Sequence, residues 1–205
     1  MNVYVESNFV LELALKQEQY ESCEKLLSLC ESGKVSLLLP AFSIAEPFET
    51  VIRRAKDRMQ LVEILNNEID QLSRSVLFKN EIGALPNVAG ILTRSCEQEL
   101  QELYTARNRI LSVAEIIPLE QNILTAAVNL QTTSRLEFLD AIVYASVLEH
   151  LRTKQVIMSC FLNKDFRDFN DPEIEDNLKS HHCKLLFSFE SGYNYVKSQL
   201  KIRNA

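Results

Sequence analysis

Acidic residues at the ends of predicted strands are the first candidates for chemistry in this sequence. Glu6 closes the β-rich start at residues 2–5, and Asp165 follows an apolar run that ends at Leu162. In a mainly parallel sheet, ligands bind beyond the carboxyl ends of the strands, so both carboxylates are candidates for binding. Each also has a structural explanation. Glu6 could favour the dipole of the helix that follows it, and Asp165 could be one more acid in a polar loop.

Two further acids lie in predicted helices. Asp140 shares a helical face with apolar residues such as Val143. A buried, unpaired carboxylate there would be costly, so Asp140 needs a cation, a hydrogen-bonding network, an arginine partner or an exposed edge. Glu46 fits a capping box that begins at Ser43, which would make it structural. Pro47 weakens that interpretation because proline has no N–H to donate, and the roles of cap and ligand both stay open for Glu46.

The elements that must position these acids follow from the apolar pattern. Compact apolar runs predict strands at residues 2–5, 35–39, 156–162 and 184–187. Helical periodicity predicts helices at residues 8–15, 20–31, 43–77, 96–113, 119–130 and 134–152. Ser134 and Glu137 form the capping box of the last of these helices. A short helix is predicted after Asp171-Pro172, and a terminal helix from Ser188 or Ser191. Strands separated by helices predict an α/β fold with a mainly parallel sheet covered on both faces.

The stretch at about residues 55–115 differs from the rest. It is rich in Glu, Gln and Arg, and its two helical segments predict a long helical hairpin inserted into the α/β frame. The sequence contains no internal repeat, low-complexity tract or linker. We therefore predict a single domain over residues 1–205.

Composition narrows the function. The chain has 205 residues, a formal net charge of −6 and a sequence pI of about 5.2, which argues against a general nucleic-acid binder but not against a nuclease with acidic ligands. Five cysteines without a C-x-x-C pair suit reduced structural thiols, and His181, His182 and Cys183 lack a second ligand pair for zinc. No apolar stretch is long enough to span a membrane and no signal peptide is evident, so a cytoplasmic location is expected.

Four segments together resemble the PIN domain family. They are VYVESNF at residues 3–9, PAFSIAE at 40–46, LDAIVYA at 139–145 and CFLNKDFRDF at 160–169. The resemblance covers the first 55 residues and about residues 119–190, and it does not extend to the inserted helices. It implies a three-layer α/β/α sandwich that binds Mg²⁺ or Mn²⁺ and cleaves RNA, or sometimes DNA, to leave a 5′-phosphate and a 3′-hydroxyl.

The resemblance also implies roles for particular residues. Glu6, Glu46, Asp140 and Asp165 match the catalytic, metal-binding acids of the family, Asp168 matches an accessory metal ligand, and Ser7 and Asn8 lie where the family has small polar residues beside the metal. Hard cations prefer carboxylate oxygens, and bound metals can activate water and stabilise the leaving oxygen. The family usually has aspartate at the first position. Glu6 is longer by one C–C bond, about 1.5 Å, so weak, altered or absent catalysis stays open.

A basic cluster follows Glu46 along the chain. It consists of Arg53, Arg54, Lys56 and Arg58. These side chains could contact RNA phosphates that flank the cut, or could form a solvated helix face. Arg107 and Arg109 form a second, smaller group of basic residues of the same kind.

Three functions stay open at this point. The first is a metal-dependent endoribonuclease, with a toxin of a toxin–antitoxin pair as one form of it. The second is a catalytically weak or inactive PIN-like module that binds RNA or a protein partner. The third is a phosphatase-like or receiver-like protein, which is disfavoured because Glu6-Ser7-Asn8 replaces the expected pair of aspartates. The amphipathic helices at residues 8–31 and in the insertion also suggest a homodimer.

Overall fold

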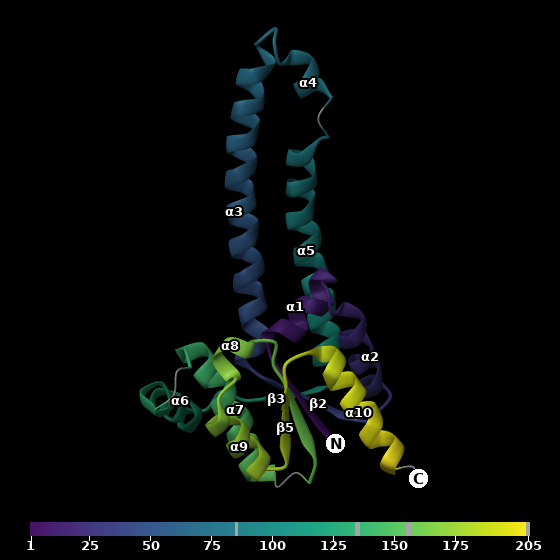
Figure 1. The fold of residues 1–205 in the computed structure, drawn as a ribbon, viewed down its shortest axis with the longest axis vertical. Coiled ribbons are helices and arrows are strands. Elements are labelled where there is room, and N and C mark those ends of the chain that lie inside the picture. Colours follow the sequence, from purple (N-terminus) through teal and green to yellow (C-terminus); the bar gives the residue numbers. More distant parts are fainter. Residues whose placement is uncertain (85, 134–135, 155–156, 204–205) are drawn as a thin grey trace.

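The computed structural model describes residues 1–84, 86–133, 136–154 and 157–203, and it is built on one parallel sheet (Figure 1). The strands are β1 (Asn2–Val5), β2 (Ser36–Pro40), β3 (Ala114–Ile117), β4 (Ser159–Leu162) and β5 (Cys183–Leu186). Their spatial order is β3-β2-β1-β4-β5, and each neighbouring pair is parallel. The predicted α/β fold with a mainly parallel sheet is confirmed.

Helices cover both faces of this sheet. Those that pack on one face are α1 (Ser7–Leu15), α2 (Tyr20–Glu31), the lower part of α5 (Val88–Leu111) and α10 (Phe189–Arg203). Those on the other face are α6 (Gln121–Thr133), α7 (Phe138–Lys154), α8 (Phe166–Phe169) and α9 (Pro172–Ser180). The remaining helices are α3 (Phe42–Ser73) and α4 (Lys79–Gly83). The molecule therefore has the three layers that the resemblance implied.

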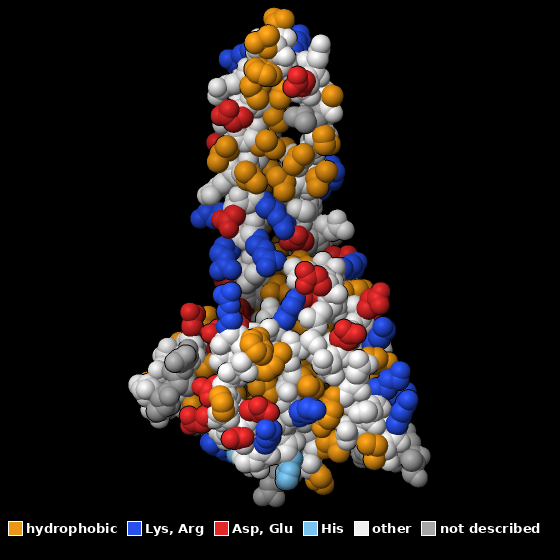
Figure 2. Space-filling view, in the orientation of Figure 1, with side chains coloured by type: hydrophobic (Ala, Val, Ile, Leu, Met, Phe, Trp, Pro, Cys, Tyr) orange, Lys and Arg blue, Asp and Glu red, His pale blue; other side chains and the backbone are white. Residues whose placement is uncertain are grey.

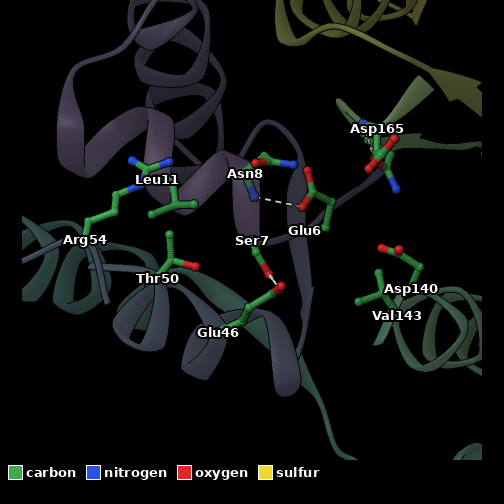
Figure 3. A pocket seen from close by; sticks show the side chains of 11 residues that line it. Glu6, Ser7, Asn8, Leu11, Glu46, Thr50, Arg54, Asp140, Val143 and Asp165 are labelled. Atoms are coloured by element: carbon green, nitrogen blue, oxygen red, sulfur yellow. Dashed lines mark hydrogen bonds between the residues drawn. The ribbon is translucent and has the colours of Figure 1, made fainter. Parts of the chain in front are cut away.

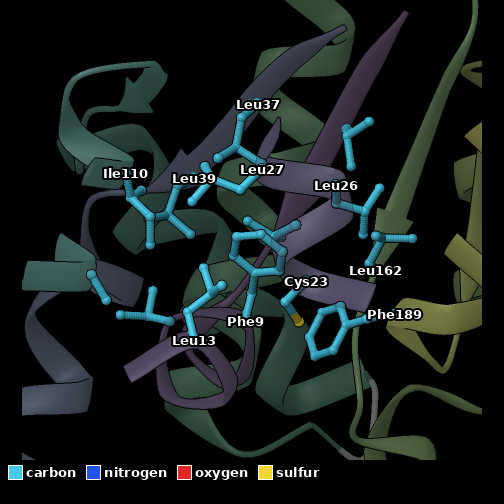
Figure 4. Packing of buried hydrophobic residues seen from close by; sticks show 14 of the residues in the cluster. Phe9, Leu13, Cys23, Leu26, Leu27, Leu37, Leu39, Ile110, Leu162 and Phe189 are labelled. Carbon is cyan, nitrogen blue, oxygen red and sulfur yellow. The ribbon is translucent and has the colours of Figure 1, made fainter. Parts of the chain in front are cut away.

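Two separate apolar cores hold the layers together, because successive side chains of a strand point to opposite faces. Val3 and Val5 enter the core under α1, α2 and α10, whereas Tyr4 between them enters the core under α6 and α7. In the first core, Phe9 of α1 meets Phe189 of α10 edge to face, with ring centroids 5.4 Å apart (Figure 4). The central strands β1, β2 and β4 are thus buried on both sides, as their continuous apolar runs require.

The predicted hairpin is formed by α3 and α5, which run side by side away from the sheet (Figure 1). Their facing residues repeat every three and four positions, as in an antiparallel coiled coil. On α3 these seam residues are Val51, Ala55, Arg58, Val62, Leu65 and Ile69, and on α5 they are Ala89, Leu92, Cys96, Glu99, Leu103, Ala106 and Ile110. Arg58 and Glu99 form an ion pair within the seam at 2.8 Å. The first two turns of α3 belong to the α/β frame, so one continuous helix joins the frame to the hairpin.

Several predicted boundaries differ from the structure. The edge strand β3 was not predicted, because only four residues of mixed polarity form it directly after α5. Helix α5 begins at Val88 rather than residue 96, and the short helices α4 and α8 were not predicted. Strand β4 begins at Ser159 rather than residue 156. Ser134 of the predicted capping box, and residue 156 at the predicted strand start, lie outside the described residues.

Within the described ranges, no helix combines the length and the apolar character that a membrane crossing requires.

Candidate acidic site

A cavity of about 260 Å³ lies at the carboxyl end of the sheet, where the strand order reverses between β1 and β4. Such a switch point is the usual place for a ligand in a parallel α/β sheet. The lining residues are Glu6, Ser7, Asn8, Leu11, Glu46, Thr50, Arg54, Asp140, Val143, Asn163 and Asp165 (Figure 3). The four acids singled out in the sequence therefore lie around one cavity, although they come from four distant segments.

Glu6 caps the first helix and also presents an unused oxygen. Its side chain is 6% exposed, and Oε2 accepts a hydrogen bond from the backbone N–H of Asn8 at 2.7 Å. Its Oε1 is buried and has no hydrogen-bond partner among the described residues. The pKa of Glu6 is raised to about 8, mainly by burial and also by the nearby Glu46, against the opposing effect of backbone groups of Asn8 and Lys164. The carboxyl group thus has one oxygen fixed by the helix and one free for a cation.

Glu46 is held toward the cavity by the first helix. Ser7 donates a hydrogen bond from Oγ to Oε2 of Glu46. Helix α3 begins after Ala41 and has no side-chain cap, so the alternative in which Glu46 forms a capping box with Ser43 is wrong. The helix continues through Pro47, and its next turn places Thr50 on the cavity wall.

Asp140 lies half-buried in the first turn of α7. The pKa of Asp140 is raised to about 7, mainly by burial and also by the carboxylates of Asp168, Asp165 and Glu46. It forms no ion pair with any described arginine. The acid in the apolar face therefore has no internal cation and faces other acids, a situation that a divalent ion would relieve.

Asp165 is fixed by the turn that follows β4. It accepts hydrogen bonds from the backbone N–H groups of Arg167 at 3.1 Å and Asp168 at 3.4 Å, and thereby caps α8. Its own N–H donates to Oδ1 of Asn163 at 2.7 Å. Burial, together with Asp165, raises the pKa of Asp168.

Asn163 was missed in the sequence. It is 3% exposed, lines the cavity and forms the turn that directs Asp165. Its one sequence signal is an amide residue directly after a buried apolar strand, the position at which ligands bind in a parallel sheet.

Lys164 lies beside the acids but does not neutralise them. Its Nζ is 2.5 Å from Oε1 of Glu12, a carboxylate that is 1% exposed, and 3.6 Å from Glu18. Glu12 also accepts a hydrogen bond from the backbone N–H of Gln19 at 2.8 Å. This network holds the turn after β4 against α1 and directs the lysine ammonium away from the cavity.

The basic residues predicted to contact RNA phosphates have different surroundings in the structure. Arg54 lines the cavity, two turns beyond Glu46 on the same face of α3. Arg58 instead pairs with Glu99, while Arg53 and Lys56 are exposed without lining the cavity. In the second group of basic residues, Arg107 stacks on Phe48 and Tyr104, and Arg109 pairs with Glu24 and Glu31.

The donor set suits a hard cation in part. Its atoms are carboxylate oxygens, and the buried Oε1 of Glu6 lacks a partner, as expected of an atom that serves as a ligand. Across the described ranges, however, no three His, Cys, Asp or Glu side chains are arranged to hold a metal ion by themselves. Mg²⁺ commonly binds one or two carboxylates and completes its shell with water and substrate phosphates. The residues fit that open kind of site rather than a closed protein cage.

Known proteins resemble this chain at the level of a family model and of one solved structure. No curated protein matches the chain. A chain in the crystal structure of VapBC2 from Rickettsia felis bound to a DNA fragment from their promoter is similar in structure, with a TM-score of 0.46 and 12% identity over 91% of this chain and 98% of that one. The family model described as PIN domain matches residues 3–169. The resemblance found in the sequence is thus confirmed, and the chain belongs to the PIN domain family.

Proposed function

We propose that this PIN domain protein is a metal-dependent endoribonuclease that hydrolyses phosphodiester bonds of RNA with Mg²⁺ or Mn²⁺. The observation that carries the proposal is the meeting of Glu6, Glu46, Asp140 and Asp165 around one cavity at the switch point of the sheet. Membership of a family whose members are typically nucleases supports the same conclusion. The acidity of the chain is compatible with it because four of the acids line the cavity where a cation would bind.

The side chains have distinct tasks in this proposal. Glu6, Glu46, Asp140 and Asp165 would hold the metal, with Asp168 as an accessory acid. The metal would supply an activated water and would stabilise the leaving oxygen of the phosphodiester. Ser7 orients Glu46 through its hydrogen bond, Asn8 fixes one oxygen of Glu6, and Asn163 directs Asp165. Arg54 would contact a phosphate beside the scissile bond. Arg53 and Lys56 would contact phosphates farther along the strand.

The test is cleavage of single-stranded RNA in the presence of Mn²⁺. We expect Asp140→Asn to lower the cleavage rate at least about 100-fold, since even outer-shell changes at metal sites cost 10–100-fold. The matched control is Asp176→Asn, an acid on α9 whose side chain is 80% exposed. It should cleave like the unmodified chain. Equal activity in Asp140→Asn and the control would contradict the proposal.

A second function is supported by the hydrogen bond that already occupies one oxygen of Glu6. Its carboxylate caps α1, and no three acids are arranged to hold a metal by themselves within the described residues. These two observations favour a module that binds RNA or a protein partner with little or no catalysis. Glu6→Asp separates the two candidates, because the shorter acid restores the residue usual in the family. Unchanged RNA binding with no cleavage in either protein, under Mg²⁺ or Mn²⁺, would favour the module.

Toxin activity, an antitoxin partner and a cytoplasmic location stay predictions. VapBC2 of Rickettsia felis was crystallised with a DNA fragment from its promoter. Co-expression of this chain with the product of an adjacent small reading frame, followed by purification of the complex, would test for an antitoxin.

A further inference from the structure

Helix α1 buries one charged side chain among apolar ones, and the proposed reaction gives it no task. Glu12 is 1% exposed, and the other buried residues of α1 are uncharged. Its partner is the ammonium of Lys164, and it also accepts a hydrogen bond from the backbone N–H of Gln19. Replacing a buried ion pair with apolar residues is often neutral or stabilising, so stability alone does not account for a charged pair at this place.

The position of Lys164 in the chain brings it close to the acids. It lies between Asn163 and Asp165, which both line the cavity. Its backbone opposes the rise in the pKa of Glu6 and therefore lies against that carboxylate. A lysine side chain has a long flexible stem and an ammonium with several N–H donors. Without the bond to Glu12, this ammonium would lie within reach of the carboxylates around the cavity.

The ammonium is held by two carboxylates that differ in burial and distance. Nζ of Lys164 is 2.5 Å from Oε1 of the buried Glu12 and 3.6 Å from Oε2 of Glu18, whose side chain is 89% exposed. A short bond to a buried carboxylate is strong, whereas water screens the longer contact with an exposed one. Glu12 is therefore the group that fixes the direction of the lysine, and Lys164 does not line the cavity.

The turn after β4 does not depend on this ion pair alone. The backbone N–H of Asn163 donates to the carbonyl oxygen of Leu186 in β5 at 3.0 Å. The side chain of Asn163 accepts from the N–H of Asp165, and Asp165 caps α8. Because these bonds direct Asp165 without the lysine side chain, the ion pair has a separate consequence, which is the location of a positive charge.

Positive charge at the cavity would compete with a metal ion. Arg54 already borders the acids, and Figure 2 shows lysines and arginines beside aspartates and glutamates where the hairpin leaves the globular part. A second monovalent cation would pair with the same carboxylate oxygens and would repel a divalent ion. It would not activate water as a bound metal does.

We propose that Glu12 is a positioning residue that holds the Lys164 ammonium away from the cavity and thereby keeps the acids free for a divalent cation. Glu12 has this role only if the cavity binds a metal, as the proposed function requires, but catalysis is not needed for it. The two residues of the pair then act in opposite directions. Loss of Glu12 weakens metal binding, whereas loss of Lys164 does not.

Mn²⁺ binding by the full chain tests this role without RNA, and the electron paramagnetic resonance signal of free Mn²⁺ measures the affinity. We expect Glu12→Gln to weaken binding about 10–100-fold, the range found when groups behind metal ligands are changed. Glutamine keeps an acceptor for the N–H of Gln19 but has no charge to hold the lysine. Glu12→Gln combined with Lys164→Met should bind Mn²⁺ nearly as well as the unmodified chain, because the competing ammonium is gone.

Two further variants serve as controls, and circular dichroism shows whether each variant is folded. Glu18→Gln makes the same change at the exposed partner of the same lysine and should leave Mn²⁺ affinity unaltered, because Glu12 still holds the ammonium. Lys164→Met alone should also keep the affinity or raise it. This variant tests the direction of the effect even if Glu12→Gln does not fold.

The double variant separates charge placement from a structural tie. If it binds Mn²⁺ no better than Glu12→Gln, the pair supports the site only by holding the turn, and the proposal is overturned. Loss of Mn²⁺ affinity in Lys164→Met overturns it as well. Binding that Glu12→Gln leaves unchanged overturns the role of Glu12 alone, whereas absence of Mn²⁺ binding by the unmodified chain overturns this role together with the proposed function.

Discussion

The α/β frame and the helical hairpin use apolar residues in opposite ways. In the frame, the strand residues Tyr4, Leu38 and Phe161 are fully buried between two helical layers. In the outer hairpin, Val62 is buried in the seam whereas Leu61 beside it is half exposed. The frame buries its apolar residues in a full core, whereas the outer hairpin buries only the single row of residues along its seam.

The two regions also treat charge differently. The cavity of the frame gathers four acids with Arg54 on its wall, and burial raises the pKa of Glu6 and of Asp140. The hairpin pairs its seam charges within the chain, as Arg58 does with Glu99. The frame thus gathers like charges at its cavity, whereas the hairpin pairs its seam charges and leaves apolar side chains exposed.

The largest expected effect is loss of the frame core. Phe161→Ala should lower the free energy of unfolding by about 3–5 kcal/mol, because it removes a fully buried ring between two layers. Ile52→Ala on the exposed side of the hairpin should change it by no more than about 0.5 kcal/mol. Urea unfolding followed by circular dichroism measures both. Similar losses in the two variants would show that the regions do not differ in packing as described.

A smaller loss is expected from the seam ion pair. Arg58→Ala leaves Glu99 without its partner where both side chains are about three-quarters buried, and should cost about 1–2 kcal/mol. Replacing both residues with leucine should be neutral or stabilising, since it extends the apolar seam. Limited proteolysis of the hairpin, compared with unfolding of the whole chain, locates the effect. A double leucine variant less stable than Arg58→Ala would contradict this view of the seam.

The pH dependence of stability should separate the cavity from the hairpin. Glu6 and Asp140 have folded pKa values of about 8 and 7, above their ordinary values of 4.5 and 3.8. The folded protein without metal therefore binds extra protons, and the stability linked to them is lost as pH rises from about 4.5 to 8. Melting temperature should fall over this range, and added Mn²⁺ should restore more at pH 8 than at pH 6. Asp140→Asn should flatten both trends, and an unchanged profile would argue against Asp140 as their source.

The smallest effect is expected where the two regions touch through exposed charges. Lys16 at the end of α1 lies 3.2 Å from Glu102 of α5, with side chains 55% and 34% exposed. Glu102→Gln should change the free energy of unfolding by about 0.5 kcal/mol or less, because solvent screens such pairs. A loss of several kcal/mol would mean that this contact, rather than the shared helix α3, holds the hairpin to the frame.

The sequence predicted most elements that carry the acids, for identifiable reasons. Continuous apolar runs such as residues 35–39 indicate strands buried on both sides, and β2 lies within one residue of that range. The helical periodicity that predicted the hairpin is likewise local information. Strand β3 was not predicted because an edge strand of four residues with an exposed Glu115 carries little apolar signal.

Local patterns thus determined the parallel sheet, the helical hairpin and the identities of the candidate acids. Only the tertiary structure decided that Arg54 borders the cavity while Arg58 enters the seam, that Asn163 directs Asp165, and that one oxygen of Glu6 is buried without a partner. The physical reason is that periodicity and propensity act over a few residues. Burial and charge at a site depend on which distant segments the sheet order brings together.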